Sequence, residues 1–159
     1  MRRLGYCLLL TAACSGGKTA GTPCSIDQSV EVDAPAAAVD DCGTFDRGAL
    51  NYTDEALSAA QLCVLNDITN KRSFRLIYDA VAVSGTTVVR AAFTGVAQSG
   101  ALRLRTYAGQ GGADMSTSGS LVSERDCAAL LASSGCKPSA GIPCLDCTGA
   151  AMGVVLCRE

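Results

Sequence analysis

Ten cysteines in a chain of 159 residues constrain its fold more than any other feature. Aromatic residues are scarce, at 4%, tryptophan is absent, and much of the apolar content is alanine and valine. Small apolar side chains each bury little area, so a core built from them contributes modestly to stability. Disulfide bonds supplement such a core, at about 2–4 kcal/mol each. Their formation depends on the compartment in which the chain folds.

The N-terminal sequence MRRLGYCLLLTAACSGG has the layout of a secretory signal. Two arginines form a positive n-region, a mostly apolar stretch runs from Leu4 to Ala13, and small residues lead to Cys14. The stretch is too short for a membrane span. Its small-small-Cys ending resembles the lipobox of bacterial lipoproteins. In that family the signal is removed and the cysteine becomes the lipid-bearing first residue.

The resemblance implies a signal peptide at 1–13 and a lipid anchor on Cys14. Ser15 follows the anchor where aspartate would favour the inner membrane, which implies the outer membrane or the cell surface. An ordinary signal, giving a periplasmic or secreted protein, is the alternative. Residues 14–41 are rich in small and acidic residues and are predicted to form a flexible tether. Residues 42–159 suit a single domain.

Eight cysteines remain once Cys7 leaves with the signal and Cys14 carries lipid. An even number in an exported chain indicates a disulfide framework. Its members are Cys24, Cys42, Cys63, Cys127, Cys136, Cys144, Cys147 and Cys157. Sequence alone does not choose among the possible pairings.

Apolar periodicity predicts one long helix followed by three strands. Apolar residues recur at helical spacing over 53–70, where acidic residues open the segment and basic residues close it. Alternation of apolar and polar residues predicts strands at 73–83, 86–97 and 101–107. The two residues Ser84-Gly85 suit a tight hairpin turn, so these strands form a meander with one buried face that the helix covers.

The C-terminal third is predicted to be a disulfide-rich segment. Residues 108–120 form a Gly/Ser-rich loop, and the capping pattern at 123–126 opens a short helix that stops at Gly135. An apolar run at 153–157 adds a closing strand. The fold class is therefore α+β, with an amphipathic helix on a three- to four-stranded antiparallel β-meander. This outline resembles a cystatin-like arrangement in architecture alone.

Four arginines fall on the polar face of the predicted meander. They are Arg75, Arg90, Arg103 and Arg105, with only Asp79 opposing them. Arginine suits bidentate contact with anions, so this is a candidate face for an anionic glycan or an acidic protein partner. The favoured interpretation is a solvated outer face, since antiparallel sheets commonly have one.

For the remaining motifs, an interpretation without a function is favoured over a functional one. A relaxed P-loop pattern at 12–19 spans the expected cleavage site, and it lacks the strand and helix that such a loop needs. Cys144 and Cys147 form a CxxC, but Asp146 would raise a thiol pKa, so structural half-cystines with different partners are favoured. A zinc site is disfavoured because only one close cysteine pair is present.

The absence of histidine removes the commonest general base and metal ligand, and no basic run suggests nucleic-acid binding. No catalytic, cofactor-binding or metal-binding residue is expected. The sequence therefore predicts a lipid-anchored cell-envelope protein that is not an enzyme and binds a partner. The alternatives are a thiol–disulfide redox protein using Cys144 and Cys147, or a cystatin-like protease inhibitor. The ligand and the oligomeric state stay open.

Overall fold

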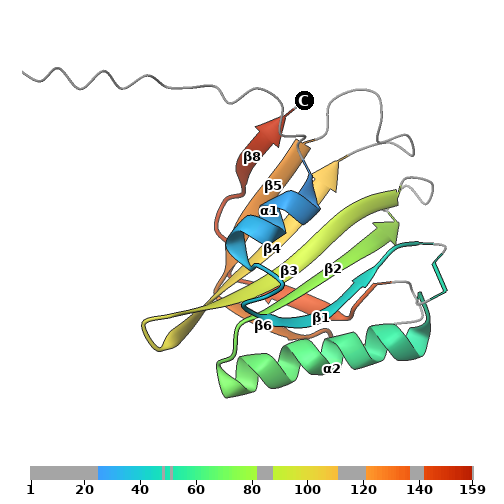
Figure 1. Cartoon of the computed structure of the whole chain (residues 1–159), viewed down its shortest axis with the longest axis horizontal. Coiled ribbons are helices and arrows are strands. Elements are labelled where there is room, and N and C mark those ends of the chain that lie inside the picture. The colour runs from blue at the N-terminus through green and yellow to red at the C-terminus, as the bar shows by residue number, and fades with distance from the viewer. Residues whose placement is uncertain are drawn as a thin grey trace, which may run out of the picture.

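A six-stranded mixed sheet forms the centre of the fold, in the order β1-β2-β3-β4-β5-β8 (Figure 1). The strands are β1 (Asp40–Phe45), β2 (Phe74–Val81), β3 (Val88–Gln98), β4 (Ala101–Gln110), β5 (Leu121–Cys127) and β8 (Val154–Arg158). β1 runs parallel to β2, and the other neighbours are antiparallel. A parallel pair needs a crossover connection, which α2 (Asp54–Asn70) supplies between β1 and β2.

The structure is a computed structural model that describes residues 25–47, 49–50, 52–81, 88–110, 121–136 and 142–158. The signal at 1–13, Cys14, the Ser84-Gly85 turn and residues 111–120 of the expected loop lie outside the described residues. Within the described residues, neither helix combines the length and apolar character that crossing a membrane requires.

The long helix and the three strands after it occur in the segments where the periodicity of apolar residues predicts them. The β3–β4 hairpin turns through Ser99 and Gly100, which both have positive φ, as a two-residue turn between right-twisted strands requires. Pairing of Leu76 with Phe93 places apolar side chains of β2 and β3 on the same face. The side chains of β2, β3 and β4 alternate between the two faces of the sheet as predicted, but the expectation of one buried face is wrong. Ile77, Ala92 and Tyr107 are buried on the second face as well.

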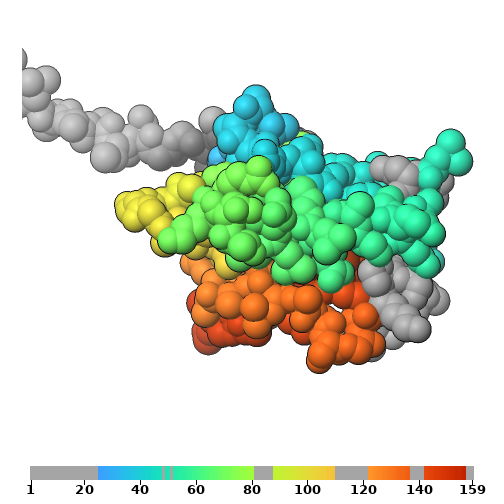
Figure 2. Space-filling view, turned by 90° about the horizontal axis from the view of Figure 1, so that it is seen from below, coloured from blue at the N-terminus to red at the C-terminus, as the bar shows by residue number. Residues whose placement is uncertain are grey.

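α2 covers the apolar face of the sheet. Thr53 caps it, with Oγ1 accepting a hydrogen bond from the Ala56 amide at 3.2 Å. Leu57, Ala60 and Val64 are buried from the helix side. They pack in one cluster with Phe74, Leu76, Tyr78, Phe93 and Leu104 of the sheet. Figure 2 shows α2 (green) spread along this side of the molecule, beside the C-terminal segment drawn in orange.

A second helix, α1 (Ile26–Asp33), covers the opposite face. Ser25 caps α1, and Ile26 and Val30 are buried in a separate cluster. Their sheet partners are Ile77, Ala92, Tyr107 and Val122. The prediction of a flexible tether over 14–41 is therefore wrong for residues 25–41, which form α1 and the start of β1. Their acidic side chains pair with the sheet, so the low apolar content of this segment did not prevent folding.

The helix predicted from the capping pattern at 123–126 is also wrong. These residues belong to β5, and β6 (Ala129–Ala132) pairs with β7 (Leu145–Thr148) in a separate two-stranded sheet. The pattern is local, whereas β5 pairs along its length with β4 and places Asp126 opposite Arg105. Pairing with a neighbouring strand outweighs the capping preference of so short a segment.

The α+β class holds, but the architecture is larger than predicted. The protein is mostly sheet, with six strands of mixed direction and helices on both faces. The outline expected by analogy, one helix across an antiparallel sheet, covers α2 and β2 to β5. It includes neither α1 nor the parallel strand β1, which come from the segment assigned to the tether.

Candidate functional site

Among the described residues, three disulfide bonds join six of the eight expected cysteines. They are Cys42–Cys63, Cys127–Cys147 and Cys136–Cys144. The side chains of the other two, Cys24 and Cys157, lie outside the described residues. A disulfide framework of this kind is typical of an oxidising compartment outside the cytoplasm.

The two cysteines of the CxxC motif are not bonded to each other. Cys144 is joined to Cys136 and Cys147 to Cys127, so each is a half-cystine with its own partner. This confirms the structural interpretation of the motif. The redox pair considered as an alternative, a bond between Cys144 and Cys147, does not form.

All four arginines of the candidate anion-binding face lie on the α1 side of the sheet, and each is paired within the chain. Arg75 binds Glu31 and Asp41 at 2.6 and 2.9 Å. Arg103 forms an ion pair with Asp33. Only Asp79 was expected to oppose these arginines, because the acidic residues of α1 fall in the segment predicted to be a tether.

Arg90 and Arg105 are each shared among three carboxylates. Arg90 binds Asp27, Asp46 and Asp79 at 2.6–2.9 Å. Burial by itself would lower the pKa of Arg90, but its hydrogen bonds to these carboxylates outweigh burial and raise the pKa above its ordinary value. Arg105 binds Asp33, Glu124 and Asp126 at 2.9–3.2 Å. An external anion at this face would have to displace carboxylates of the chain itself.

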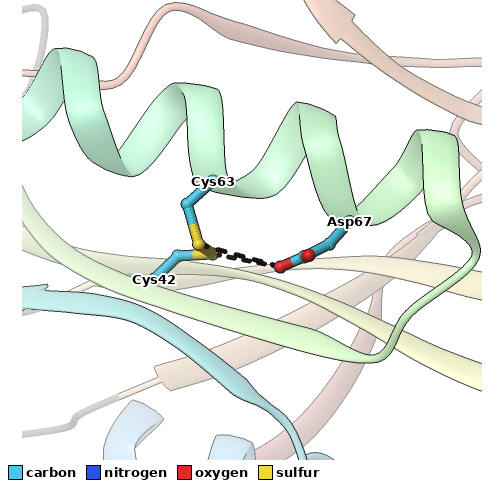
Figure 3. Close-up of side chains that lie close together, drawn as sticks. All are labelled: Cys42, Cys63 and Asp67. Atoms are coloured by element: carbon cyan, nitrogen blue, oxygen red, sulfur yellow. Dashed lines mark hydrogen bonds between the residues drawn. A yellow bond between two sulfur atoms is a disulfide. The ribbon is translucent and has the colours of Figure 1, made fainter.

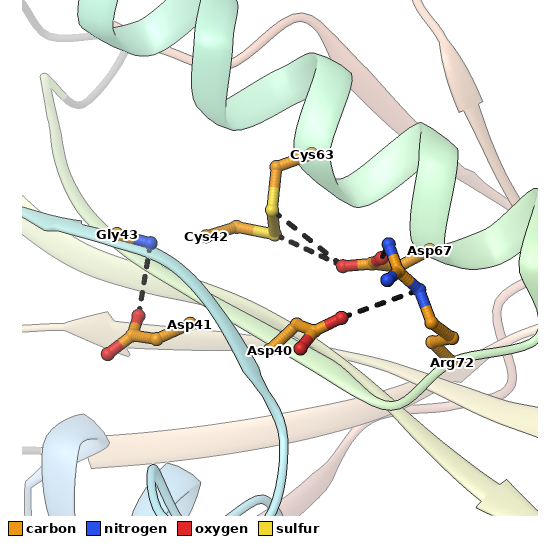
Figure 4. Close-up of a disulfide and its surroundings, with 7 residues drawn as sticks. All are labelled: Asp40, Asp41, Cys42, Gly43, Cys63, Asp67 and Arg72. Carbon is orange, nitrogen blue, oxygen red and sulfur yellow. Dashed lines mark hydrogen bonds and ion pairs between the residues drawn. A yellow bond between two sulfur atoms is a disulfide. The ribbon is translucent and has the colours of Figure 1, made fainter.

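The third arrangement is a cluster of five residues, here called the cysteine–aspartate cluster: Asp40, Cys42, Cys63, Asp67 and Arg72 (Figures 3 and 4). Cys42 comes from β1, and Cys63 lies one helical turn before Asp67 on α2, so both point to the same side of the helix. Asp67 Oδ2 lies 3.5 Å from Cys42 Sγ and 3.7 Å from Cys63 Sγ. The carboxyl group is buried, at 1% exposure.

The other oxygen of Asp67 faces charged groups. Arg72, two residues after the end of α2, forms an ion pair with Asp67 Oδ1 and places its Nε 3.4 Å from Asp40 Oδ2. Burial raises the pKa of Asp67, and Asp40 adds to this rise, while Arg72 opposes it. The net effect is a raised pKa, so Asp67 holds its proton more tightly than an ordinary aspartate.

Protonation matters here because a disulfide sulfur has no proton to donate. The contacts drawn between Asp67 and the two sulfurs in Figure 3 are hydrogen bonds only if a proton lies on the carboxyl or on the sulfurs. With the bridge intact, only Asp67 could supply that proton. With the bridge reduced, each thiol has a proton of its own for the same oxygen.

The cluster also brings three potential metal donors together. Cys42, Cys63 and Asp67 each place one donor atom within 4.8 Å of the others, and no other such group occurs among the described residues. Metal coordination by cysteine requires the thiolate. The bond between Cys42 and Cys63 removes both thiolates, so the oxidised cluster presents no ligand set for a metal ion.

Asp67 was not among the residues predicted to form a site. One sequence signal points to it: Asp67 follows Cys63 by four residues, so both lie on one face of the predicted helix. No sequence signal pointed to the other members of the cluster, because Asp40 falls in the segment predicted to be a tether and the partner of Cys42 was left open. Only the pairing of β1 with β2 brings them beside α2.

The outer edge of the sheet at β8 has an apolar surface. Met152, Val154, Val155 and Leu156 are exposed at 93%, 58%, 51% and 40%. β8 is the last strand in the order of the sheet. The first strand, β1, instead begins with Asp40, followed by another aspartate, and charged edges of this kind discourage pairing with other strands.

Comparison with protein-family models, with curated proteins and with solved structures gives no match to this chain. What the protein does must therefore be inferred from its own residues and their arrangement.

Proposed function

We propose that this protein is a cell-envelope binding module without enzymatic activity, exported and held at the outer membrane by lipid on Cys14. Its partner is a protein that adds an extended segment to the edge of the sheet at β8, the last strand in the described order. The observation that carries this proposal is the run of exposed apolar side chains on that edge strand. An edge strand offers main-chain donors and acceptors to an added strand, and neighbouring side chains supply the apolar contact.

A protein partner is favoured over an anionic glycan. The four arginines proposed for anion binding are paired with carboxylates of α1, β1, β5 and nearby segments. The β8 edge is uncharged from Met152 to Leu156. Exposed apolar side chains gain little from an acidic polysaccharide, whereas burial against a protein gives about 25 cal/mol per Å² of apolar area.

Photocrosslinking in cells that produce the protein naturally tests the partner. A photoreactive amino acid at Met152, beside β8, is expected to form one discrete adduct with a protein. A second substitution, Val155→Lys, places a charge on the edge strand and is expected to abolish that adduct. The matched control carries the probe at Leu62 of α2, which is 67% exposed, and is expected to give no Val155-dependent adduct.

Several outcomes decide the proposal. Absence of an adduct at Met152, or an adduct that persists with Val155→Lys, contradicts binding at the β8 edge. An adduct of twice the chain mass identifies a second copy of this protein as the occupant. Lipid attachment is tested separately: Cys14→Ser is expected to move the protein from the membrane fraction to the soluble fraction, and an unchanged distribution contradicts the anchor.

A further inference from the structure

The cysteine–aspartate cluster has a property that a purely structural disulfide does not need. We propose that Cys42–Cys63 is a thiol–disulfide exchange site, and that Asp67 transfers the proton to and from its sulfurs. The co-reactant is a dithiol, either a small molecule or a protein. This chemistry is independent of partner binding at β8.

The hydrogen bonding of Asp67 differs between the oxidised and the reduced state of the bridge. Oδ2 of this buried carboxyl faces both sulfurs, at 3.5 and 3.7 Å. In the oxidised state neither sulfur can donate, so this oxygen gains a hydrogen bond only by carrying the proton itself. In the dithiol both sulfurs donate to it. The same geometry therefore provides more hydrogen bonds after reduction, and stabilising the reduced form makes a disulfide easier to reduce.

This environment is specific to one of the described bridges. Within the described residues, Cys42–Cys63 is the only disulfide with a carboxylate oxygen within 4.8 Å of both sulfurs. Among the same residues, neither Cys127–Cys147 nor Cys136–Cys144 has a carboxylate oxygen within this distance of both sulfurs. The described bridges thus provide one candidate for exchange and two internal references in one molecule.

The two cysteines differ in exposure as residues: Cys42 is 7% exposed, whereas Cys63 on α2 is partly buried. The attack in the proposed reaction is therefore assigned to Cys63, the more exposed residue. A thiolate of the dithiol attacks Cys63 Sγ, the bond between the sulfurs breaks, and its electron pair goes to Cys42 Sγ. Asp67 gives its proton to the Cys42 thiolate as it leaves.

The second step completes the balance. The other thiolate of the reductant attacks its own sulfur in the mixed disulfide and releases Cys63 as a thiolate, which takes a proton from solvent. The protein gains two electrons and two protons, and the dithiol becomes a disulfide. Asp67 regains its proton from solvent.

Two charged groups face Asp67 and set when it carries the proton. Arg72 lies at the C-terminal end of α2 and forms an ion pair with it, and Asp40 comes from β1 on the other side of Arg72. Arg72 favours the carboxylate and Asp40 favours the acid. Removal of the arginine charge should therefore extend proton transfer to higher pH.

The first experiment uses the unmodified oxidised protein and dithiothreitol as the probe. Timed samples are alkylated and the state of each bridge is determined by peptide mass spectrometry. Cys42–Cys63 is expected to open before the other two bridges. Asp67→Asn is expected to lower the equilibrium constant for reduction of this bridge about two- to tenfold, the range for losing one ordinary hydrogen bond. Simultaneous opening of all three bridges in the wild-type protein overturns the proposal.

The second experiment separates proton transfer from a structural role. The rate at which Cys42–Cys63 opens is measured against pH and divided by the concentration of attacking thiolate. This normalised rate is expected to fall with rising pH in the wild-type protein and to be independent of pH in Asp67→Asn. In Arg72→Gln, which keeps Asp67, the normalised rate is expected to fall at a higher pH than in the wild-type protein. Asp146→Asn, beside Cys147, is the matched control and should leave the profile unchanged. If Asp67→Asn does not fold, an unshifted profile in Arg72→Gln overturns the proposal.

Discussion

Arg103 of β4 forms an ion pair with Asp33, the last residue of α1, although the two residues lie 70 positions apart in the chain. The Asp33 side chain is 8% exposed and also binds Arg105 at 3.2 Å. This carboxylate therefore joins the N-terminal helix to the middle of the sheet. Without it, two guanidinium groups beneath α1 would lose a shared partner.

Asp33→Asn should consequently destabilise the protein. We expect a loss of about 1.5–3 kcal/mol in the free energy of unfolding, the range for a hydrogen bond to a charged group. Urea unfolding with the disulfides intact measures it. Asp126→Asn is the control, because Asp126 binds the same Arg105 but is 58% exposed, and it should cost less than about 1 kcal/mol. Equal losses of unfolding free energy in the two variants would mean that burial of Asp33 does not strengthen its ion pairs.

Asp67 should give the stability of the protein a recognisable dependence on pH. Burial raises its pKa in the folded state, against Arg72, so the folded chain binds this proton more tightly than the unfolded chain. The resulting stabilisation is complete below the unfolded pKa of about 4 and is lost as the pH rises through the folded value. The difference in unfolding free energy between the wild-type protein and Asp67→Asn should therefore decrease with rising pH. An increase would show that Arg72 outweighs burial.

The two remaining cysteines of the framework, Cys24 and Cys157, are expected to form a fourth bridge. The described neighbours support this pairing. Ile26, two residues after Cys24, lies close enough to Gly109 that an added Cβ there would be 3.3 Å from its Cδ1. Gly109 pairs with Val122, which in turn pairs with Cys157. Mass spectrometry of an unreduced digest should find one peptide pair joined through these cysteines, and two free thiols would contradict the pairing.

Gly95 of β3 should tolerate no side chain. It lies opposite Phe74 in the β2–β3 pairing, and a Cβ added at Gly95 would be 2.3 Å from Phe74 Cε1. Phe74 is fully buried, so its ring has little room to move. Gly95→Ala should cost about 1–3 kcal/mol in thermal or urea unfolding. Phe74→Leu in the same chain should recover part of that loss, whereas strictly additive effects would exclude the contact as the cause.

The sequence was sufficient to predict an element where the apolar residues within that element recur at regular spacing. α2 and strands β2 to β4 follow from apolar residues at helical or alternating spacing. The same reasoning predicted a helix for residues that form β5 and β6. The capping pattern there concerns a few neighbouring residues, while the strand gains its stability from pairing with β4 and β8.

The sequence by itself determined that the cysteines form a disulfide framework, which segments contain the long helix and the central strands, and that four arginines share one face. Tertiary structure decided how these parts combine. It placed α1 on the arginine face, because the carboxylates of a segment with few apolar residues neutralise the guanidinium groups there. It also brought Asp67 beside Cys42 and Cys63. Pairings between residues distant in sequence depend on the packing of whole elements, which the spacing of residues along the chain does not encode.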